Sequence, residues 1–131
     1  MGGIGGHAGL FGTVDGVLDF AQAVLDTDAG GDPLGVGAAR FQQSIDRRHM
    51  HPRGTRVLGW DTPTPGSSSA GRHIGRRSIG HLGFTGTSIW LDLDARVAVV
   101  LLSNRVCPSR DNDRIRAFRP RIHEAVWQAL P

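Results

Sequence analysis

At 131 residues, with 39% of them hydrophobic, the chain is long enough for one small domain with a modest core. It contains neither lysine nor tyrosine, so it cannot itself supply an ammonium group or a phenol for proton transfer. Cys107 is the single cysteine, which excludes an internal disulfide and a thiolate metal cluster. We expect no cofactor.

The formal net charge is +3, but the arginines are spread from Arg40 to Arg121 and aromatic residues are few. This distribution offers no stacking platform for bases, so nucleic acid is not an expected partner. No apolar run approaches the roughly 20 residues that span a bilayer, and residues 1–4 lack the basic start of a secretion signal. As it stands, the chain is expected in the cytoplasm.

Two helices and a short strand are predicted in the first half. Thr13 can cap a helix that ends near Thr27, because its apolar residues recur at helical spacing: Val14, Val17, Leu18, Ala21, Val24 and Leu25. A second, weaker helix is predicted from about Val36 to Arg47, and a short strand over Arg56 to Trp60. The polar, turn-rich segment 61–75 is not expected in the core.

Three strands follow, around Ser78 to Gly83, from Thr87 to Asp92 and from Arg96 to Ser103, and they are predicted to form an antiparallel meander. The last strand contains a continuous apolar run over residues 97–102. Such a run is typical of a strand covered on both faces, so we expect it at the centre of the sheet.

A terminal helix is predicted over residues 111–130, with a break or new start at Pro120. Its expected buried stripe is Ile115, Phe118, Ile122, Val126 and Leu130. The predicted fold class is therefore α+β: one domain over residues 1–131, in which an antiparallel sheet of about three strands packs with N- and C-terminal helices.

The segment from His81 to Gly86 combines an imidazole with a glycine that permits close approach of a ligand to the backbone. The Phe84 N–H, which follows Gly83, could face a developing oxyanion, and a well-aligned donor of this kind contributes about 3 kcal/mol. A purely structural glycine-rich strand explains the same residues, and the residues alone favour it.

Other candidate motifs are weaker evidence for a functional site. His7, in a glycine-rich turn before the first helix, either borders a site or caps the backbone. His49 and His51, without a clear third ligand, do not predict a metal site. Residues 3–6 follow no strand, so they do not match a dinucleotide-binding turn. The serines at 67–69 match neither Ser-x-x-Lys nor Gly-x-Ser-x-Gly, and no serine has a visible activating base.

Taken together, the segments 6–13, 80–88 and 99–105, with the helices that follow the first and the last, resemble the C-terminal part of the serine β-lactamase-like family. That family includes class C β-lactamases, DD-peptidases and related esterases. The resemblance covers nearly the whole chain, and it implies that the predicted domain is part of a larger β-lactamase or transpeptidase-like fold.

The resemblance implies roles for several residues. His81-Leu82-Gly83 matches the third family motif, usually Lys-Thr-Gly and in many esterase-like members His-Thr-Gly, so Leu82 departs from threonine and lacks its hydroxyl. His81 would orient substrate or assist proton transfer, and the Phe84 N–H would complete the oxyanion hole. The remaining substrate-binding candidates are Gly83, Thr85, His7, Asn104 and Arg105.

The family nucleophile lies in Ser-x-x-Lys and its proton relay commonly in Tyr-x-Asn, and neither motif occurs here. We therefore expect a truncated gene product, a domain fragment or half of a split enzyme, inactive alone. Its expected partners are an upstream catalytic segment and an acyl-type small-molecule or peptide substrate. One rival is a noncatalytic interaction module whose uncovered surface binds a partner chain. Another is a basic binding domain using Arg110, Arg114, Arg116, Arg119 and Arg121, although the pattern favours these residues as a solvated face of the terminal helix.

Overall fold

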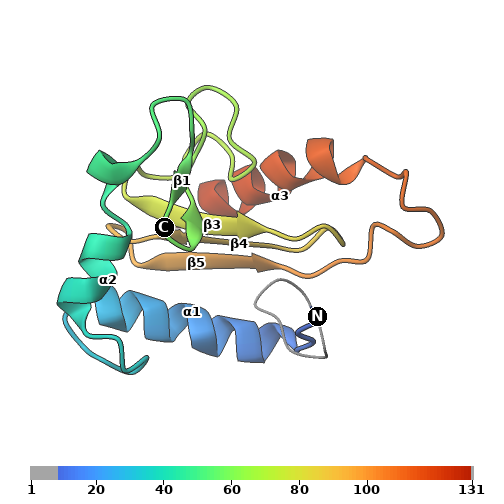
Figure 1. Cartoon of the computed structure of the whole chain (residues 1–131). Helices are drawn as coiled ribbons and strands as arrows, with labels where there is room; N and C mark the ends of the chain where they lie inside the picture. Colours follow the sequence, from blue (N-terminus) through green and yellow to red (C-terminus); the bar gives the residue numbers. More distant parts are fainter. Residues whose placement is uncertain (1–8, 131) are drawn as a thin grey trace.

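The computed structural model describes residues 9–130. Within them a five-stranded antiparallel sheet lies between helix α1 on one face and helix α3 on the other (Figure 1). The helices are α1 (Val14–Asp28), α2 (Ala38–Ser44) and α3 (Ile115–Ala129), with a short 3-10 helix at Arg47–His49. The strands are β1 (Arg56–Val57), β2 (Trp60–Asp61), β3 (Ser78–Leu82), β4 (Ser88–Asp92) and β5 (Val97–Leu101). The α+β class is confirmed.

The sheet has more strands than the three expected, because the segment predicted as one strand folds back on itself. Val57 pairs with Trp60 across a two-residue turn whose second residue, Gly59, has a φ of 79°. A positive φ of this kind suits glycine and lets β1 and β2 form a tight hairpin. Asp61 then pairs with Gly80, which attaches the hairpin to β3.

The expected position of the last strand is wrong. The strand order is β1-β2-β3-β4-β5, so β5 lies at an edge of the sheet and not at its centre within residues 9–130. Val99 is buried and the other four residues of β5 are half-buried. Each strand pairs with the next along the chain, and a meander of this kind leaves its last strand with a single neighbour.

Helix α1 begins and ends close to the predicted residues. The Thr13 hydroxyl accepts a hydrogen bond from the Gly16 N–H at 3.2 Å, which satisfies one of the free donors in the first turn. Helix α2 is shorter than predicted. The chain leaves it at Ile45, and Asp46 caps the following 3-10 helix by accepting from the Arg48 N–H.

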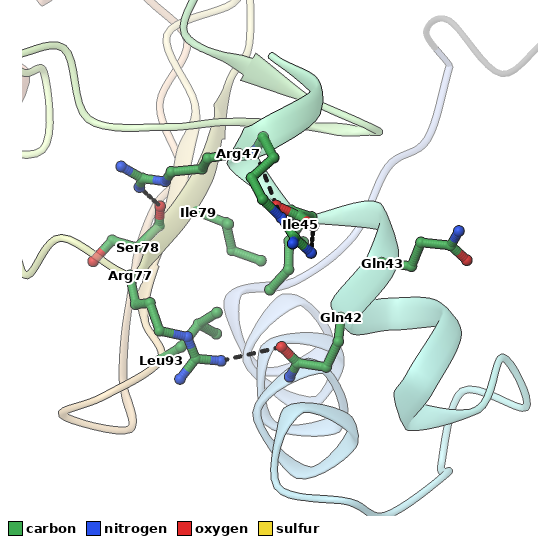
Figure 2. Close-up of a pocket in the computed structure, with 10 residues that line it drawn as sticks. Gln42, Gln43, Ile45, Arg47, Arg77, Ser78, Ile79 and Leu93 are labelled. Carbon is green, nitrogen blue, oxygen red and sulfur yellow. Dashed lines mark hydrogen bonds and ion pairs between the residues drawn. The ribbon is translucent and has the colours of Figure 1, made fainter.

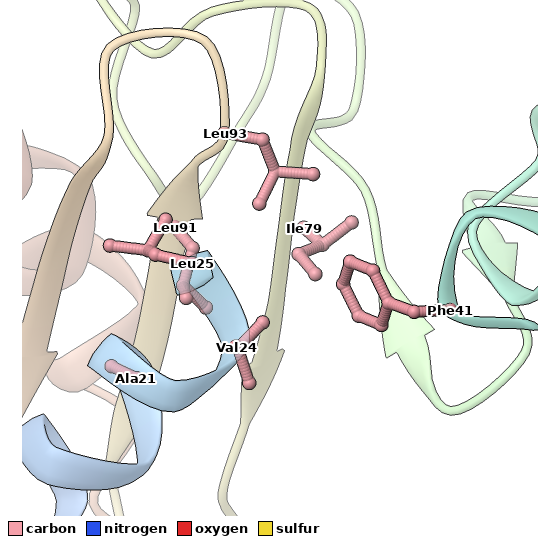
Figure 3. Packing of buried hydrophobic residues seen from close by; sticks show 7 residues of the cluster. All are labelled: Ala21, Val24, Leu25, Phe41, Ile79, Leu91 and Leu93. Atoms are coloured by element: carbon pink, nitrogen blue, oxygen red, sulfur yellow. The ribbon is translucent and has the colours of Figure 1, made fainter. Parts of the chain in front are cut away.

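The main core lies between α1, α2 and the face of the sheet formed by β3 and β4. It contains the buried residues Ala21, Val24, Leu25, Phe41, Ile79, Leu91 and Leu93 (Figure 3). The N-terminal half of α1 is less well covered, because the Val14 and Leu18 side chains are 45% and 39% exposed. This part of the helix therefore presents apolar surface to solvent.

Helix α3 differs from the prediction in three ways. It begins at Ile115 and not at residue 111, it continues through Pro120 without a break, and its buried stripe is Ile115, Arg119 and His123. Phe118, expected in the core, is 46% exposed. The stripe is mainly polar because the strands beneath it offer hydrogen-bonding groups, as described below. Arg119 therefore does not belong to a solvated basic face.

The loop before β3 is partly buried, contrary to expectation. Ala70 is fully buried, and its carbonyl oxygen accepts a hydrogen bond from the indole N–H of Trp127 on α3 at 3.1 Å. The Glu124 carboxylate accepts from the Arg72 N–H at 2.7 Å. These contacts from α3 satisfy polar groups of the loop, which is why so polar a segment can lie against the domain.

Candidate functional site

The candidate site is built on the hairpin of β3 and β4. Its connecting turn closes through two hydrogen bonds, from the Gly83 N–H to the Thr87 carbonyl at 2.8 Å and from the Gly86 N–H to the Gly83 carbonyl at 3.1 Å. Gly86 has a φ of 102°, and a Cβ there would overlap the Ser103 hydroxyl. Only glycine fits this position without strain.

Phe84 lies at the tip of this turn with a side chain that is 62% exposed. Among residues 9–130 its backbone N–H has no hydrogen-bond acceptor, whereas the neighbouring Gly83 and Gly86 N–H groups are both satisfied within the turn. An unpaired amide of an exposed residue on a well-defined turn is able to donate to a bound oxygen atom.

Arg105 brings the predicted residues Phe84 and Thr85 together with the segment after β5. Its N–H donates to the Thr85 carbonyl at 2.9 Å, and its Nε donates to the Phe84 carbonyl at 2.7 Å. The guanidinium also lies 4.6 Å from the centre of the Phe84 ring, a cation–π contact. The adjacent Asn104 is exposed, and its carbonyl accepts from the Cys107 N–H.

The same guanidinium holds the loop that leads to α3. Arg105 Nη1 donates to the Arg110 carbonyl at 2.8 Å and to the Asn112 carbonyl at 2.6 Å. Arg110 itself lies 5.7 Å from the centre of the Phe84 ring. Arg105 therefore links the turn to this loop. Much of its capacity to donate hydrogen bonds is used on backbone carbonyls of the chain itself.

His81 is exposed at the end of β3, three residues before Phe84. Its Nε2 lies 3.2 Å from Nη1 of Arg56 on β1. Because a guanidinium can only donate, His81 Nε2 must accept, which places the ring proton on Nδ1. Arg56 also lies 3.9 Å from Asp61 across the hairpin. The sequence contained no signal for this contact, because it depends on the turn at Gly59.

Gly83, expected to allow a ligand close to the backbone, has a structural role as well. A Cβ at Gly83 would overlap the Thr87 hydroxyl, so a larger residue here would displace the Thr87 side chain. Thr85 is exposed beside it. His7, the remaining predicted substrate-binding residue, lies outside the described residues.

A buried polar layer lies beneath the turn, between the sheet and α3. Ser88 Oγ is 3.1 Å from His123 Nε2, and both residues are buried. Burial, with a smaller contribution from the nearby Arg119 charge, lowers the pKa of His123 to about 4, so its ring is neutral at pH 7. The sequence pattern indicated no base beside any serine. The only available signal was the four-residue spacing of Arg119 and His123 on one helix face.

Neither of two other features adds to this site. A cavity of about 510 Å³ lies between α2, the 3-10 helix and the start of β3, where Arg47 donates to the Ser78 carbonyl at 3.1 Å (Figure 2). His81 and Phe84 do not line it. Among the side chains that the structure describes, residues 9–48 and 50–130, no group of three or more His, Cys, Asp or Glu is arranged to hold a metal ion.

Comparison with known proteins identifies the family. The model of the β-lactamase family matches residues 1–121. The chain belongs to the β-lactamase family. Two curated relatives, both named "Putative D-alanyl-D-alanine carboxypeptidase", come from Escherichia coli O157:H7 and Escherichia coli strain K12. They are 33% and 32% identical to the chain over 108 residues.

These matches cover 80% of this β-lactamase family chain but 24% of each relative. The chain therefore spans about a quarter of the length of the curated relatives that it matches. No solved structure matches it significantly. Within residues 9–130, no helix is both long and apolar enough to cross a membrane. The family resemblance read from the segments around His7 and His81 is confirmed.

Proposed function

We propose that this chain forms the substrate-binding wall of a serine hydrolase and supplies one of its two oxyanion-hole donors. The observation that carries the proposal is the unpaired backbone N–H of Phe84, an exposed residue on the β3–β4 turn. A tetrahedral intermediate places negative charge on a carbonyl oxygen, and a preorganised backbone donor stabilises that charge more than it stabilises the substrate. His81, three residues earlier on β3, would contact the substrate.

The nucleophile and its base would come from another segment of polypeptide. The chain contains no lysine and no tyrosine, so it cannot provide Ser-x-x-Lys or Tyr-x-Asn. Its match to about a quarter of each relative is consistent with a role as one part of a larger catalytic unit. Alone, the chain is expected to bind substrate weakly and not to hydrolyse it.

Two neighbouring surfaces suit the docking of such a segment. Strand β5 pairs only with β4 among residues 9–130, so its outer edge presents unpaired backbone groups. Helix α1 packs against β5, and apolar side chains before and along this helix are exposed: Leu10, Phe11, Val14 and Leu18. Burying a large apolar side chain fully contributes about 1.5–3 kcal/mol, so this surface can stabilise an association appreciably.

The names of the two curated relatives suggest the substrate to test first, an acyl peptide that ends in D-alanyl-D-alanine. Esters and β-lactams present the same electrophilic carbonyl and are the alternatives. Leu82 stands where most members of the family carry a threonine, so one hydroxyl that would contact substrate is absent. For this reason a simple ester, which needs fewer contacts, is included in the test.

The experiment measures hydrolysis of three substrates by the purified chain, alone and mixed with a separately expressed segment encoded upstream of it. The substrates are a chromogenic ester, a chromogenic cephalosporin and an acyl-D-alanyl-D-alanine peptide. Activity only in the mixture supports the proposal. Activity of the chain alone, or none in a mixture shown to associate, contradicts it.

A matched pair of variants tests the Phe84 N–H itself. Phe84→Pro removes the backbone donor, whereas Phe84→Ala removes the ring and keeps the donor. Loss of one oxyanion donor lowers kcat by roughly 100-fold or more, so the proline variant should be far less active than the alanine variant. Equal activities in two folded variants would contradict the role of this amide.

A noncatalytic interaction module is the second candidate, favoured by the same exposed apolar surface at Leu10, Phe11 and α1. In that case the chain would bind the upstream segment or another partner without gaining hydrolytic activity. Association measured by calorimetry, with no turnover of any of the three substrates, distinguishes this candidate from the split hydrolase.

A further inference from the structure

Arg119 on α3 makes a contact with the β3–β4 turn that exposed arginines of this helix do not make. A single nitrogen, Nη2, donates to the Gly83 carbonyl at 2.7 Å and to the Thr87 carbonyl at 2.8 Å. These two carbonyls stand at the two ends of the turn that carries Phe84. The Arg119 residue is only 7% exposed, so solvent does not compete strongly for its hydrogen bonds.

The contact at Gly83 acts directly on the candidate oxyanion donor. The Gly83 carbonyl and the Phe84 N–H belong to the same planar peptide group, in which the two bonds point in opposite directions when the peptide is trans. A donor that holds the carbonyl toward α3 therefore turns the Phe84 N–H away from α3, toward the exposed side of the turn. The Gly86 N–H bonds the same carbonyl and reinforces this orientation.

Charge adds to this geometric effect. A guanidinium that bonds the Gly83 carbonyl draws electron density toward that oxygen and strengthens the Phe84 N–H as a donor. Within residues 9–130 Arg119 has no carboxylate partner, and its buried Nε has no acceptor. A buried cation without a counter-ion is costly, so stability of the fold does not by itself account for an arginine here.

One helical turn after Arg119, a second side chain of α3 contacts the same hairpin. His123 contacts Ser88 on β4, the residue that follows Thr87. Its ring is neutral at pH 7, because burial and the Arg119 charge hold the His123 pKa at about 4. His123 therefore adds no positive charge beside Arg119 at this pH.

We propose that Arg119 is a positioning residue, which fixes the Gly83–Phe84 peptide so that the Phe84 N–H faces the reacting carbonyl oxygen. This inference rests on the proposed function of Phe84 and extends it to a residue on α3 that does not touch substrate. Without Arg119 the peptide can rotate, and the donor is aligned for only part of the time.

The first test is made on the unmixed chain and needs no activity. Arg119→Met keeps most of the apolar stem and removes both hydrogen bonds, while Arg121→Met, at an exposed position of the same helix, is the matched control. In Arg119→Met, amide hydrogen exchange of Gly83 and Gly86 should be at least about 10-fold faster, since both donate within the turn. Leu91 should exchange as in the wild type, and Arg121→Met should change none of the three.

The second test asks whether the turn geometry affects the reaction. In the mixture with the upstream segment, Arg119→Met should lower kcat by at least about 10-fold with little change in KM, because the lost alignment matters mainly in the transition state. Arg119→Lys keeps a cationic donor and should recover part of the lost kcat. A purely structural role predicts loss of folded protein with unchanged kcat per folded molecule.

The outcomes separate the two proposals. Wild-type exchange rates at Gly83 and Gly86 in a folded Arg119→Met variant would overturn the inference, as would an unchanged kcat. If Arg119→Met does not fold, the contact is tested in the wild-type chain by NMR. Scalar coupling across the hydrogen bonds from the Arg119 side chain to the Gly83 and Thr87 carbonyl carbons supports the contact, and absence of this coupling excludes it. A wild-type mixture without turnover contradicts the proposed function, while the exchange result still tests the contact itself.

Discussion

Ser88 Oγ and His123 Nε2 lie 3.1 Å apart between β4 and α3, although the two residues are 35 positions apart in the sequence. A serine beside a histidine is the arrangement of an activated nucleophile. Here both residues are buried, at 4% and 0% exposure, so a substrate carbonyl cannot reach the hydroxyl. The Ser88–His123 contact therefore links helix α3 to strand β4.

The burial of His123 should make the stability of the fold depend on pH. The unfolded chain binds a proton at His123 near the ordinary pKa of 6.5, whereas in the folded chain burial lowers that pKa to about 4. The free energy of unfolding should therefore be greatest above pH 6.5 and fall as the pH is lowered toward 4. Urea unfolding at several pH values measures it, and His123→Gln should show a smaller fall. Identical pH profiles for both proteins would contradict the assignment.

Gly80 and Trp90 face each other on β3 and β4. A Cβ at Gly80 would overlap the buried Trp90 ring, which has little room to move. We expect Gly80→Ala to lower the free energy of unfolding by about 1–3 kcal/mol, measured by urea denaturation. At Gly12 a Cβ meets no atom of the described residues within 4 Å, so Gly12→Ala is the control and should change stability little. Equal effects at the two positions would contradict this packing.

The contact of Arg56 with His81 predicts a particular tautomer. Because Arg56 donates to Nε2, the neutral His81 ring should carry its proton on Nδ1. Nitrogen chemical shifts of the imidazole at pH 8 measure the tautomer populations. Arg56→Met should shift them toward the Nε2–H form, and Arg53→Met, at an exposed position nearby, should leave them unchanged. A dominant Nε2–H form in the wild type would exclude the contact.

Leu82 allows the missing hydroxyl of the family motif to be restored. If the proposed function holds, Leu82→Thr should raise kcat/KM of the mixture toward a D-alanyl-D-alanine peptide by about 10-fold, the effect of one substrate hydrogen bond of about 1.4 kcal/mol. Leu82→Val shortens the side chain in the same way without adding a hydroxyl, so it separates the two effects. Equal rates for the threonine and valine variants would argue against a substrate contact at this position.

Local patterns in the sequence predicted much of the fold. The helical spacing after Thr13 located α1, because a capping hydroxyl and an apolar stripe act within a few residues. The strands around His81, Trp90 and Val99 were also predicted, with boundaries within a few residues of those observed. The β1–β2 hairpin was missed, since its strands are two residues long and carry almost no periodic signal.

Phe84 and His81 were identified as candidate site residues from a short motif, which a sequence displays directly. The buried contacts of Arg119 and His123 were not identified. Charged residues on a terminal helix are usually solvated, so the pattern predicted an apolar stripe through Phe118 and an exposed basic face. The acceptors that draw Arg119 inward are backbone carbonyls of Gly83 and Thr87, more than 30 residues earlier in the chain.

The sequence by itself determined the family, the presence of the three helices and the strands of the hairpin that carries the candidate site, because these depend on local order and on recognisable motifs. Only the tertiary structure decided that β5 lies at an edge and that α3 buries a guanidinium under the turn at Phe84. The physical reason is that a backbone carbonyl has no signature in the sequence, and the side chain that satisfies it is chosen by the packing of distant elements.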